Sequence, residues 1–147
     1  MNYGADTSIV LRVLTGEPSS LAQIVQTRLT ALWSQGDRIA ICDMVLAEAY
    51  FALQHSYGLA KKDALDALKL LAAHPGFSLS ASAVSALRTP NLEKASPGFI
   101  DRVIHGTYMT DANAESIMLT CEKDAKRLGH VEVLKDVKQT LSAKGTS

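Results

Sequence analysis

Four acidic residues occupy positions where a carboxylate needs an explanation. Asp6 and Glu122 each follow a short apolar stretch, Glu48 is the only charged residue within residues 44–53, and Asp101 lies among core-forming residues. Because ligands collect at the carboxyl ends of parallel strands, we expect Asp6 and Glu122 at one sheet edge. Four carboxylates in one cleft repel one another unless a divalent cation neutralises them, and oxygen ligands suit Mg²⁺ or Mn²⁺. The chemistry would be phosphodiester hydrolysis by a metal-activated water.

Each acid also has a simpler explanation. Asp6 and Asp101 stand where helices are expected to begin, and a carboxylate there caps the helix or is favoured by its dipole. Glu48 lies in a segment that is apolar on every helical face and is therefore expected to be buried, so an arginine could neutralise it. Glu122, like Asp124, could be a solvated residue of a first helical turn. The metal interpretation depends on the four acids meeting.

Other catalytic motifs are missing from the sequence. The four histidines show no HxH or HExxH spacing, and neither a phosphate-binding glycine-rich loop nor a Gly-x-Ser-x-Gly elbow is present. Cys42 and Cys121 stand far apart, which indicates small apolar fillers in a reducing compartment. A zinc site, a nucleotide cradle and a serine hydrolase are therefore not supported.

Composition indicates one folded domain. The chain has 147 residues, 47% of them hydrophobic, and its 15 basic residues balance 15 acidic ones, so any contact with RNA must be local. The sequence starts without a secretory signal and has no apolar run of about 20 residues, so we expect a cytoplasmic protein without a membrane segment. Residues 1–135 are predicted to form the domain, and residues 136–147 a polar tail.

The elements that must position the acids alternate along the chain. Strands are expected up to residue 6 and at 38–42, 77–79, 116–120 and 131–134, and the strand at 116–120 is expected to be buried. Helices are expected after Asp6, from about 17 to 36, at 44–57, 60–74 and about 80–88, from the Ser96-Pro97 cap to 108, and before Gly129. This alternation predicts an α/β protein with a three-layer α/β/α fold around a central, mainly parallel sheet.

The ordered acids resemble the PIN-domain family, and within it the VapC-type toxins. The segments that carry the resemblance are Ala5-Asp6-Thr7-Ser8, Leu46-Ala47-Glu48, Gly98-Phe99-Ile100-Asp101-Arg102-Val103-Ile104-His105, Leu119-Thr120-Cys121-Glu122-Lys123 and Leu128-Gly129-His130-Val131-Glu132-Val133-Leu134. Each segment is weak evidence alone, and their order and approximate spacing make the combination more specific. The resemblance spans nearly the whole chain.

The resemblance implies a function and a site. The metal-binding acids of the family correspond to Asp6, Glu48, Asp101 and Glu122, and its small hydroxyl residues near the metal correspond to Thr7 and Thr120. The implied activity is an endoribonuclease that depends on Mg²⁺ or Mn²⁺ and acts as the toxin of a type II toxin-antitoxin pair. Similar proteins usually form homodimers and are held inactive by a cognate antitoxin protein.

Several positions depart from the family pattern. Gly98 stands where many relatives have an acid, Glu122 where they have Asp, Arg102 where Ala is common, and Cys121 where Phe is common. These departures leave a second hypothesis open, a catalytically degenerate PIN domain that binds RNA or protein without cutting it. Arg102 and the nearby cations Lys123, Lys126 and Arg127 could contact RNA phosphates, or could belong to a solvated helix face.

Overall fold

The computed structural model describes residues 2–110 and 115–135. Within them the strands are β1 (Tyr3–Gly4), β2 (Ile39–Ala40), β3 (Phe77–Ser78), β4 (Met118–Thr120) and β5 (Val131–Val133). The α-helices are α1 (Thr7–Thr15), α2 (Ser19–Ser34), α3 (Asp43–His55), α4 (Lys61–Ala73), α5 (Ala81–Leu87) and α6 (Phe99–Met109), and the 3-10 helices are η1 (Leu92–Lys94) and η2 (Lys123–Leu128). The predicted alternation of strands and helices is confirmed. The predicted tail at 136–147 lies outside the described residues.

The strands form two parallel sheets. One has the order β1-β2-β3, in which Gly4 pairs with Ala40 and Ala40 with Ser78, and the other consists of β4 and β5. The chain is therefore a mixed α/β protein with short parallel strands. The described parallel strands lie in two separate sheets, and a single central sheet within a three-layer arrangement stays a prediction.

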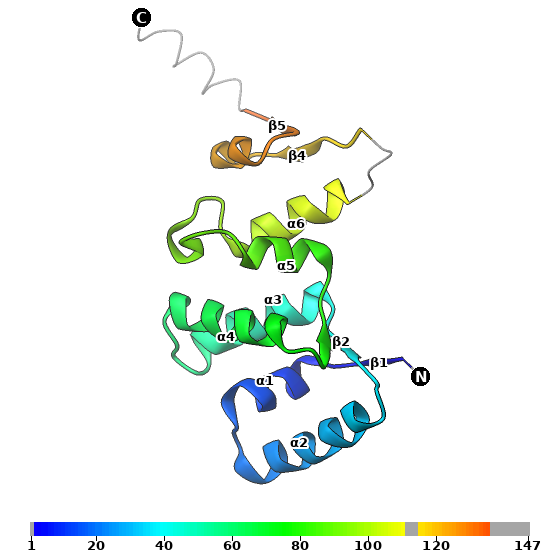
Figure 1. Ribbon diagram of the computed structural model, residues 1–147. Coiled ribbons are helices and arrows are strands. Elements are labelled where there is room, and N and C mark those ends of the chain that lie inside the picture. The colour runs from blue at the N-terminus through cyan, green and yellow to red at the C-terminus, as the bar shows by residue number, and fades with distance from the viewer. Residues whose placement is uncertain (1, 111–114, 136–147) are drawn as a thin grey trace, which may run out of the picture.

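The elements are stacked along the molecule (Figure 1). Helices α1 and α2 lie at one end beside β1 and β2, α3 and α4 follow, then α5 and α6, and β4, β5 and η2 lie at the opposite end. None of the helices in residues 2–110 and 115–135 has the length and apolar character needed to cross a membrane.

Capping residues set several helix boundaries. The Asp6 side chain accepts a hydrogen bond at the start of α1, and Gly16 ends that helix in the left-handed conformation, as N-cap and C-cap chemistry predict. Ser80 caps α5 through the Ala83 amide. The cap predicted at Ser96-Pro97 is wrong, because α6 begins only at Phe99 with Gly98 as its N-cap residue.

The core gathers around one face each of α3 and α4. Leu46 and Leu53 of α3 and Leu65 and Leu68 of α4 are almost fully buried. Their spacing places them along one stripe of each helix, which is the pattern that buries a helix against a neighbour. Burial of such side chains is the main contribution to the stability of the fold.

Helix α3 is not buried on every face, contrary to the expectation from its composition. Met44 and Phe51 are 75% and 48% exposed, and Glu48 between them is also exposed. These three residues are spaced four and three apart, so they share one side of the helix. Glu48 therefore needs no neutralising arginine to be tolerated, and its carboxylate is accessible to a ligand.

Trp33 joins α2 to the start of β3. Its indole N–H donates to the Gly76 carbonyl at 3.0 Å, and its ring lies against His74 and, edge-on, against Phe77. A side chain on Gly76 would collide with the Trp33 ring, so glycine is required by this close approach. The contact holds α2 against the amino end of β3.

Strand β4 is far more exposed than its sequence predicts. Ile117 and Leu119 are 65% and 63% exposed, whereas Met118 and Thr120, on the other face, are half-buried. The prediction of a buried strand at 116–120 is therefore wrong for this face. The strand has the apolar sequence of a buried strand, but no element in the described part of the chain covers Ile117 and Leu119.

Two leucines of α4 test the assignment of the core. Leu68→Ala should lower the free energy of unfolding by about 2–5 kcal/mol, because it leaves a cavity at a fully buried position. Leu70→Ala, at a position that is 73% exposed, should change it by no more than about 0.5 kcal/mol. Urea unfolding of both variants measures the difference, and equal effects would contradict this packing.

Candidate functional site

Asp6, Thr7 and Glu48 form one continuous polar group. The Thr7 amide donates to Asp6 Oδ1 at 2.8 Å, and the Thr7 hydroxyl donates to Glu48 Oε2 at 2.6 Å. Asp6 and Glu48 are exposed, so their remaining carboxylate oxygens are accessible. Residues that are 41 positions apart are thus joined at the start of α1 by a single hydroxyl.

Sheet register explains why this group lies where it does. Gly4, Ala40 and Ser78 pair across β1, β2 and β3, so the residues two positions later lie at the same carboxyl edge. Asp6 is one of these residues and Ser80 is another. The loops that leave parallel strands at this edge are where ligands bind in open α/β sheets.

Asp43 at this edge is an acid that was not among the predicted site residues. It is the first residue of α3, and its carboxylate accepts a hydrogen bond from the Ser80 hydroxyl at 2.6 Å. The same rule that selects Asp6, an acid directly after a short strand, could have selected Asp43. Ser80 uses its hydroxyl twice, since it also accepts from the Ala83 amide at 3.1 Å.

A second acidic group lines a cavity beside β4. Asp101 of α6, Thr120 of β4, and Glu122 and Asp124 after it surround a space of about 200 Å³. The Glu122 amide donates to the Thr120 hydroxyl at 3.1 Å, which fixes the turn that follows the strand. Ser96 donates to the Asp124 carboxylate. Asp124, which was interpreted from the sequence as a solvated acid, therefore belongs to this group.

The structure brings the four predicted acids together as two pairs. Asp6 and Glu48 meet through Thr7 near β1, whereas Asp101 and Glu122 line the cavity near β4 at the other end of the stack (Figure 1). Within residues 2–110 and 115–135, no three acids, histidines or cysteines are grouped so that they could hold a metal ion. The single ring of four carboxylates stays a prediction.

The neighbouring cations make structural contacts. The Arg102 Nε donates to the Pro97 carbonyl at 2.7 Å, and the Arg127 guanidinium donates to the Ser96 carbonyl at 3.0 Å. Arg102 is half-buried, so its predicted contact with an RNA phosphate would need its remaining nitrogens. Cys42 and Cys121 are both exposed, so the interpretation of these cysteines as small apolar fillers is wrong.

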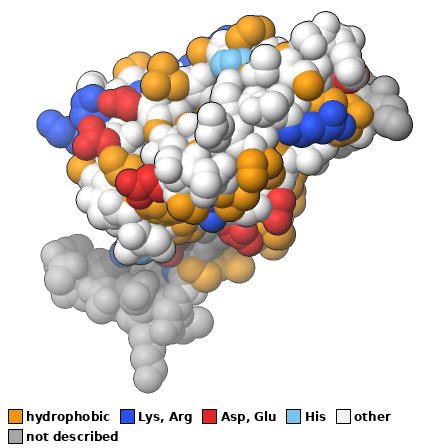
Figure 2. Space-filling view, turned by 90° about the horizontal axis from the view of Figure 1, so that it is seen from below, with side chains coloured by type: hydrophobic (Ala, Val, Ile, Leu, Met, Phe, Trp, Pro, Cys, Tyr) orange, Lys and Arg blue, Asp and Glu red, His pale blue; other side chains and the backbone are white. Residues whose placement is uncertain are grey.

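The face at the α1–α2 end has no continuous region of one charge. Figure 2 shows Lys and Arg side chains interspersed with Asp and Glu there, with hydrophobic side chains between them. This agrees with the equal numbers of acidic and basic residues in the chain. Attraction of RNA to this face would depend on local contacts and not on a broad positive potential.

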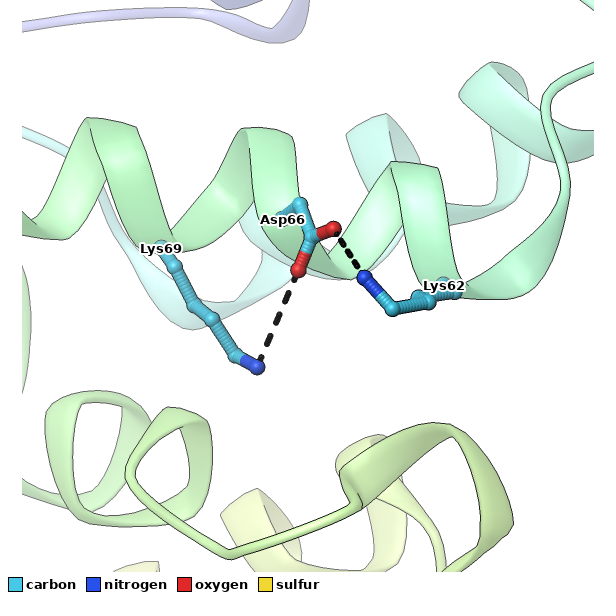
Figure 3. A network of polar contacts seen from close by, with 3 residues as sticks. All are labelled: Lys62, Asp66 and Lys69. Atoms are coloured by element: carbon cyan, nitrogen blue, oxygen red, sulfur yellow. Dashed lines mark hydrogen bonds and ion pairs between the residues drawn. The ribbon is translucent and has the colours of Figure 1, made fainter.

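An ion-pair network on α4 lies outside the candidate site (Figure 3). Lys62 lies 2.8 Å and Lys69 3.9 Å from the Asp66 carboxylate. The hydrogen bond from Lys62 lowers the pKa of Asp66, with a further Coulombic contribution from both lysines, and the same bond raises the pKa of Lys62. The spacing of four and three residues on an exposed helix face is typical of a structural pair.

Comparison of the chain with protein-family models, with curated proteins and with solved structures found no match. The chemistry of the two acidic groups must therefore be argued from their own side chains. Those side chains are carboxylates and threonine hydroxyls, which are oxygen donors throughout.

The Thr7–Glu48 hydrogen bond can be tested by a double-mutant cycle. Thr7→Val and Glu48→Ala each remove one partner, so their effects on unfolding should be non-additive by about 0.5–1 kcal/mol, as expected for an exposed, charge-assisted contact. Thr15→Val is the matched control. Thr15 donates within its own helix to the Leu11 carbonyl, so the effect of Thr15→Val on unfolding should be additive with that of Glu48→Ala. Additivity of Thr7→Val with Glu48→Ala would contradict the contact.

The α4 network should make a pH-dependent contribution to stability. Because the pKa of Asp66 is lowered by folding, its contribution is complete above the ordinary value of about 3.9 and is lost as the pH falls through the folded value. Asp66→Asn should therefore be less stable than the wild type at about pH 7, and the two should converge in acid. Urea unfolding across pH measures this. A difference that is unchanged from neutral to acid pH would be inconsistent with the ion pair.

Proposed function

We propose that this chain is a Mg²⁺- or Mn²⁺-dependent endoribonuclease of the PIN-domain type. The observation that carries the proposal is the group formed by Asp6, Thr7 and Glu48, in which one threonine donates its amide to the first accessible carboxylate and its hydroxyl to the second. Its place at the carboxyl edge of a parallel sheet adds support. The proposal includes a three-layer α/β/α arrangement in which both sheets belong to one core.

The donor chemistry of both acidic groups fits a hard divalent cation. As the resemblance implies, Asp6, Glu48, Asp101 and Glu122 would hold the metal through oxygen ligands alone, which requires the two acidic groups to meet. When bound, such a cation lowers the pKa of a water and stabilises the leaving oxygen of a phosphodiester. The hydroxyl of Thr7 holds Glu48 in place, and the amide of Thr7 does the same for Asp6.

The biological role follows from the same resemblance. We propose a cytoplasmic toxin of a type II toxin-antitoxin pair, with RNA as substrate, a cognate antitoxin protein as inhibitor and a homodimer as the working form. The accessible side of α3 around Glu48, with Met44 and Phe51 exposed next to it, is a surface that an inhibitor could cover. Arg102 is the proposed contact to an RNA phosphate.

One observation favours a second function. The acids lie in two groups that do not meet within the described residues, and Gly98 supplies no side chain at the start of α6. A degenerate PIN domain that binds RNA or a protein without cutting it would need no single metal cluster. Metal binding separates the two functions, because the degenerate domain would bind its partner without Mn²⁺.

Cleavage of a structured RNA tests the proposed activity. The wild type should cleave in Mg²⁺ or Mn²⁺, and Asp6→Asn or Glu48→Gln should slow cleavage by at least about 100-fold, because each removes a metal-binding charge. Asp63→Asn on α4 changes the same charge away from the site and should leave the rate unchanged. Gel electrophoresis of end-labelled RNA measures all four rates.

Two results would contradict the enzymatic proposal. One is a wild-type rate no higher than that of Asp6→Asn in either metal. The other is RNA binding without any heat of Mn²⁺ binding in calorimetry, which would favour the binding module.

A further inference from the structure

Phe51 is a large aromatic side chain that the fold leaves in water beside the candidate site. It follows Glu48 by three residues on the same side of α3, and 48% of it is exposed. Residues three apart on a helix are neighbours, with about 5–6 Å between their Cβ atoms, so the ring adjoins the Glu48 side chain. Burial of this ring against a flat ligand would be favourable.

Neighbouring rings hold Phe51 in place. The buried Tyr50 ring meets it with 5.4 Å between the centroids and 64° between the planes, and Tyr50 in turn contacts the buried Phe99 at 5.3 Å. Toward the end of α3, the exposed His55 ring lies almost parallel to Phe51, with 16° between the planes and 6.3 Å between the centroids. Phe51 is therefore anchored to the core through Tyr50 and extended toward solvent by His55.

A flat aromatic surface beside a site for phosphodiester chemistry fits a nucleobase. Every base has a π face, and stacking on an aromatic side chain changes affinity by roughly 5- to 150-fold per base, with little dependence on sequence. The nucleotides that flank a scissile phosphate carry the bases nearest to the carboxylates. Phe51 adjoins Glu48, so it lies where such a base would be.

The two sides of Glu48 differ in the side chain that they offer. Phe51 lies toward the end of α3, and Met44, which is 75% exposed, lies toward its start. A methionine side chain is flexible and has no flat face. A base could therefore stack on the Phe51 side of Glu48 but not on the Met44 side.

The contact between α1 and α3 places a cation toward the same end of α3. The Thr7 hydroxyl donates to Glu48, and Arg12, five residues later, donates to the Tyr57 hydroxyl just after α3 at 3.4 Å. The two helices therefore run in the same direction, and Arg12 lies about 7.5 Å further along α1 than Thr7. Among the described residues, the buried Arg12 Nε has no hydrogen-bond partner. This guanidinium is suited to a phosphate, which accepts from several of its nitrogens.

Charge at the opposite end of α3 has the other sign. Asp43 is the first residue of the helix and precedes Met44 directly, so a carboxylate lies at that end. A polyanion is favoured near Arg12 and disfavoured near Asp43. The flat ring and the cation thus lie toward the same end, which favours a nucleotide as the occupant, since its base and its phosphate need these two contacts together.

We propose that Phe51 is a substrate-positioning residue, which stacks on the base next to the scissile phosphate on one side of the cut only, and that Arg12 contacts a phosphate on that same side. The inference rests on the proposed function for the identity of the substrate and for the place of the cut. It adds that the RNA is held asymmetrically across the cleavage site.

Abasic RNA tests the asymmetry. The structured RNA of the cleavage assay is prepared with one base removed on either side of the bond that the wild type cuts. Removal on one side should lower kcat/KM about 10-fold, because one stacking contact is lost, and removal on the other side should leave it unchanged. Gel electrophoresis of end-labelled RNA measures both rates. Equal effects on the two sides overturn the asymmetry.

Variants of Phe51 locate the stacking contact. Phe51→Ala should lower kcat/KM for intact RNA about 10-fold and should lose nothing more on the abasic RNA, whereas Phe51→Trp should restore both the rate and its dependence on the base. Met44→Ala, at the exposed residue on the other side of Glu48, is the matched control and should behave as the wild type. Circular dichroism checks that each variant is folded. If Phe51→Ala cleaves but keeps the wild-type dependence on the base, the stacking is overturned and the proposed activity stands.

The salt dependence of RNA binding tests Arg12. Arg12→Gln should reduce the slope of log K against log salt by about 1, because one phosphate contact is lost, and Arg12→Lys should keep the wild-type slope. Fluorescence anisotropy of a labelled RNA strand measures the slopes. An Arg12→Gln slope equal to that of the wild type overturns the phosphate contact.

Binding without cleavage separates the stacking from the proposed activity. If the wild type cleaves nothing, its affinity in Mg²⁺ for a labelled single strand of mixed sequence should still be about 10-fold higher than that of Phe51→Ala. The two proteins should bind a fully abasic strand of the same length equally. This result with an inactive wild type overturns the proposed activity and keeps the stacking. Equal affinities for the intact strand overturn the stacking and favour a protein as the occupant of this face.

Discussion

The hydrogen bond from the Thr7 hydroxyl to the Glu48 carboxylate is the contact on which the candidate site depends. It joins the first turn of α1 to the middle of α3, and so places Glu48 beside Asp6. Because both acids are exposed, each keeps much of its hydration, and the pair is tolerated without a buried counter-charge. The site is therefore open to a cation but does not require one to fold.

Separation of the acids into two groups has a simple electrostatic consequence. Repulsion within a pair of carboxylates is weaker than repulsion within a group of four, so the isolated chain can fold without metal. Each pair alone, however, supplies few ligands for a divalent ion.

Local features of the fold were predictable from the sequence, and long-range ones were not. Asp6 and Gly16 mark the ends of α1 because capping depends on neighbouring residues alone, and the acid after a short strand identifies the carboxyl edge. Burial was mispredicted at Glu48 and Leu119, since an apolar segment does not reveal whether a neighbour covers it. The missed roles of Asp43 and Asp124 depend on hydroxyls from Ser80 and Ser96, which lie far away in the sequence.

Paramagnetic broadening by Mn²⁺ tests most directly whether the two acidic groups form one metal site. In amide NMR spectra, Mn²⁺ should broaden the signals of Thr7 and Glu122 together, at the same metal concentration, and Mg²⁺ should compete with both effects. Asp6→Asn should weaken the broadening of both signals, because both would report the same metal ion. Broadening of Thr7 in the wild type without any broadening of Glu122 would contradict a shared site.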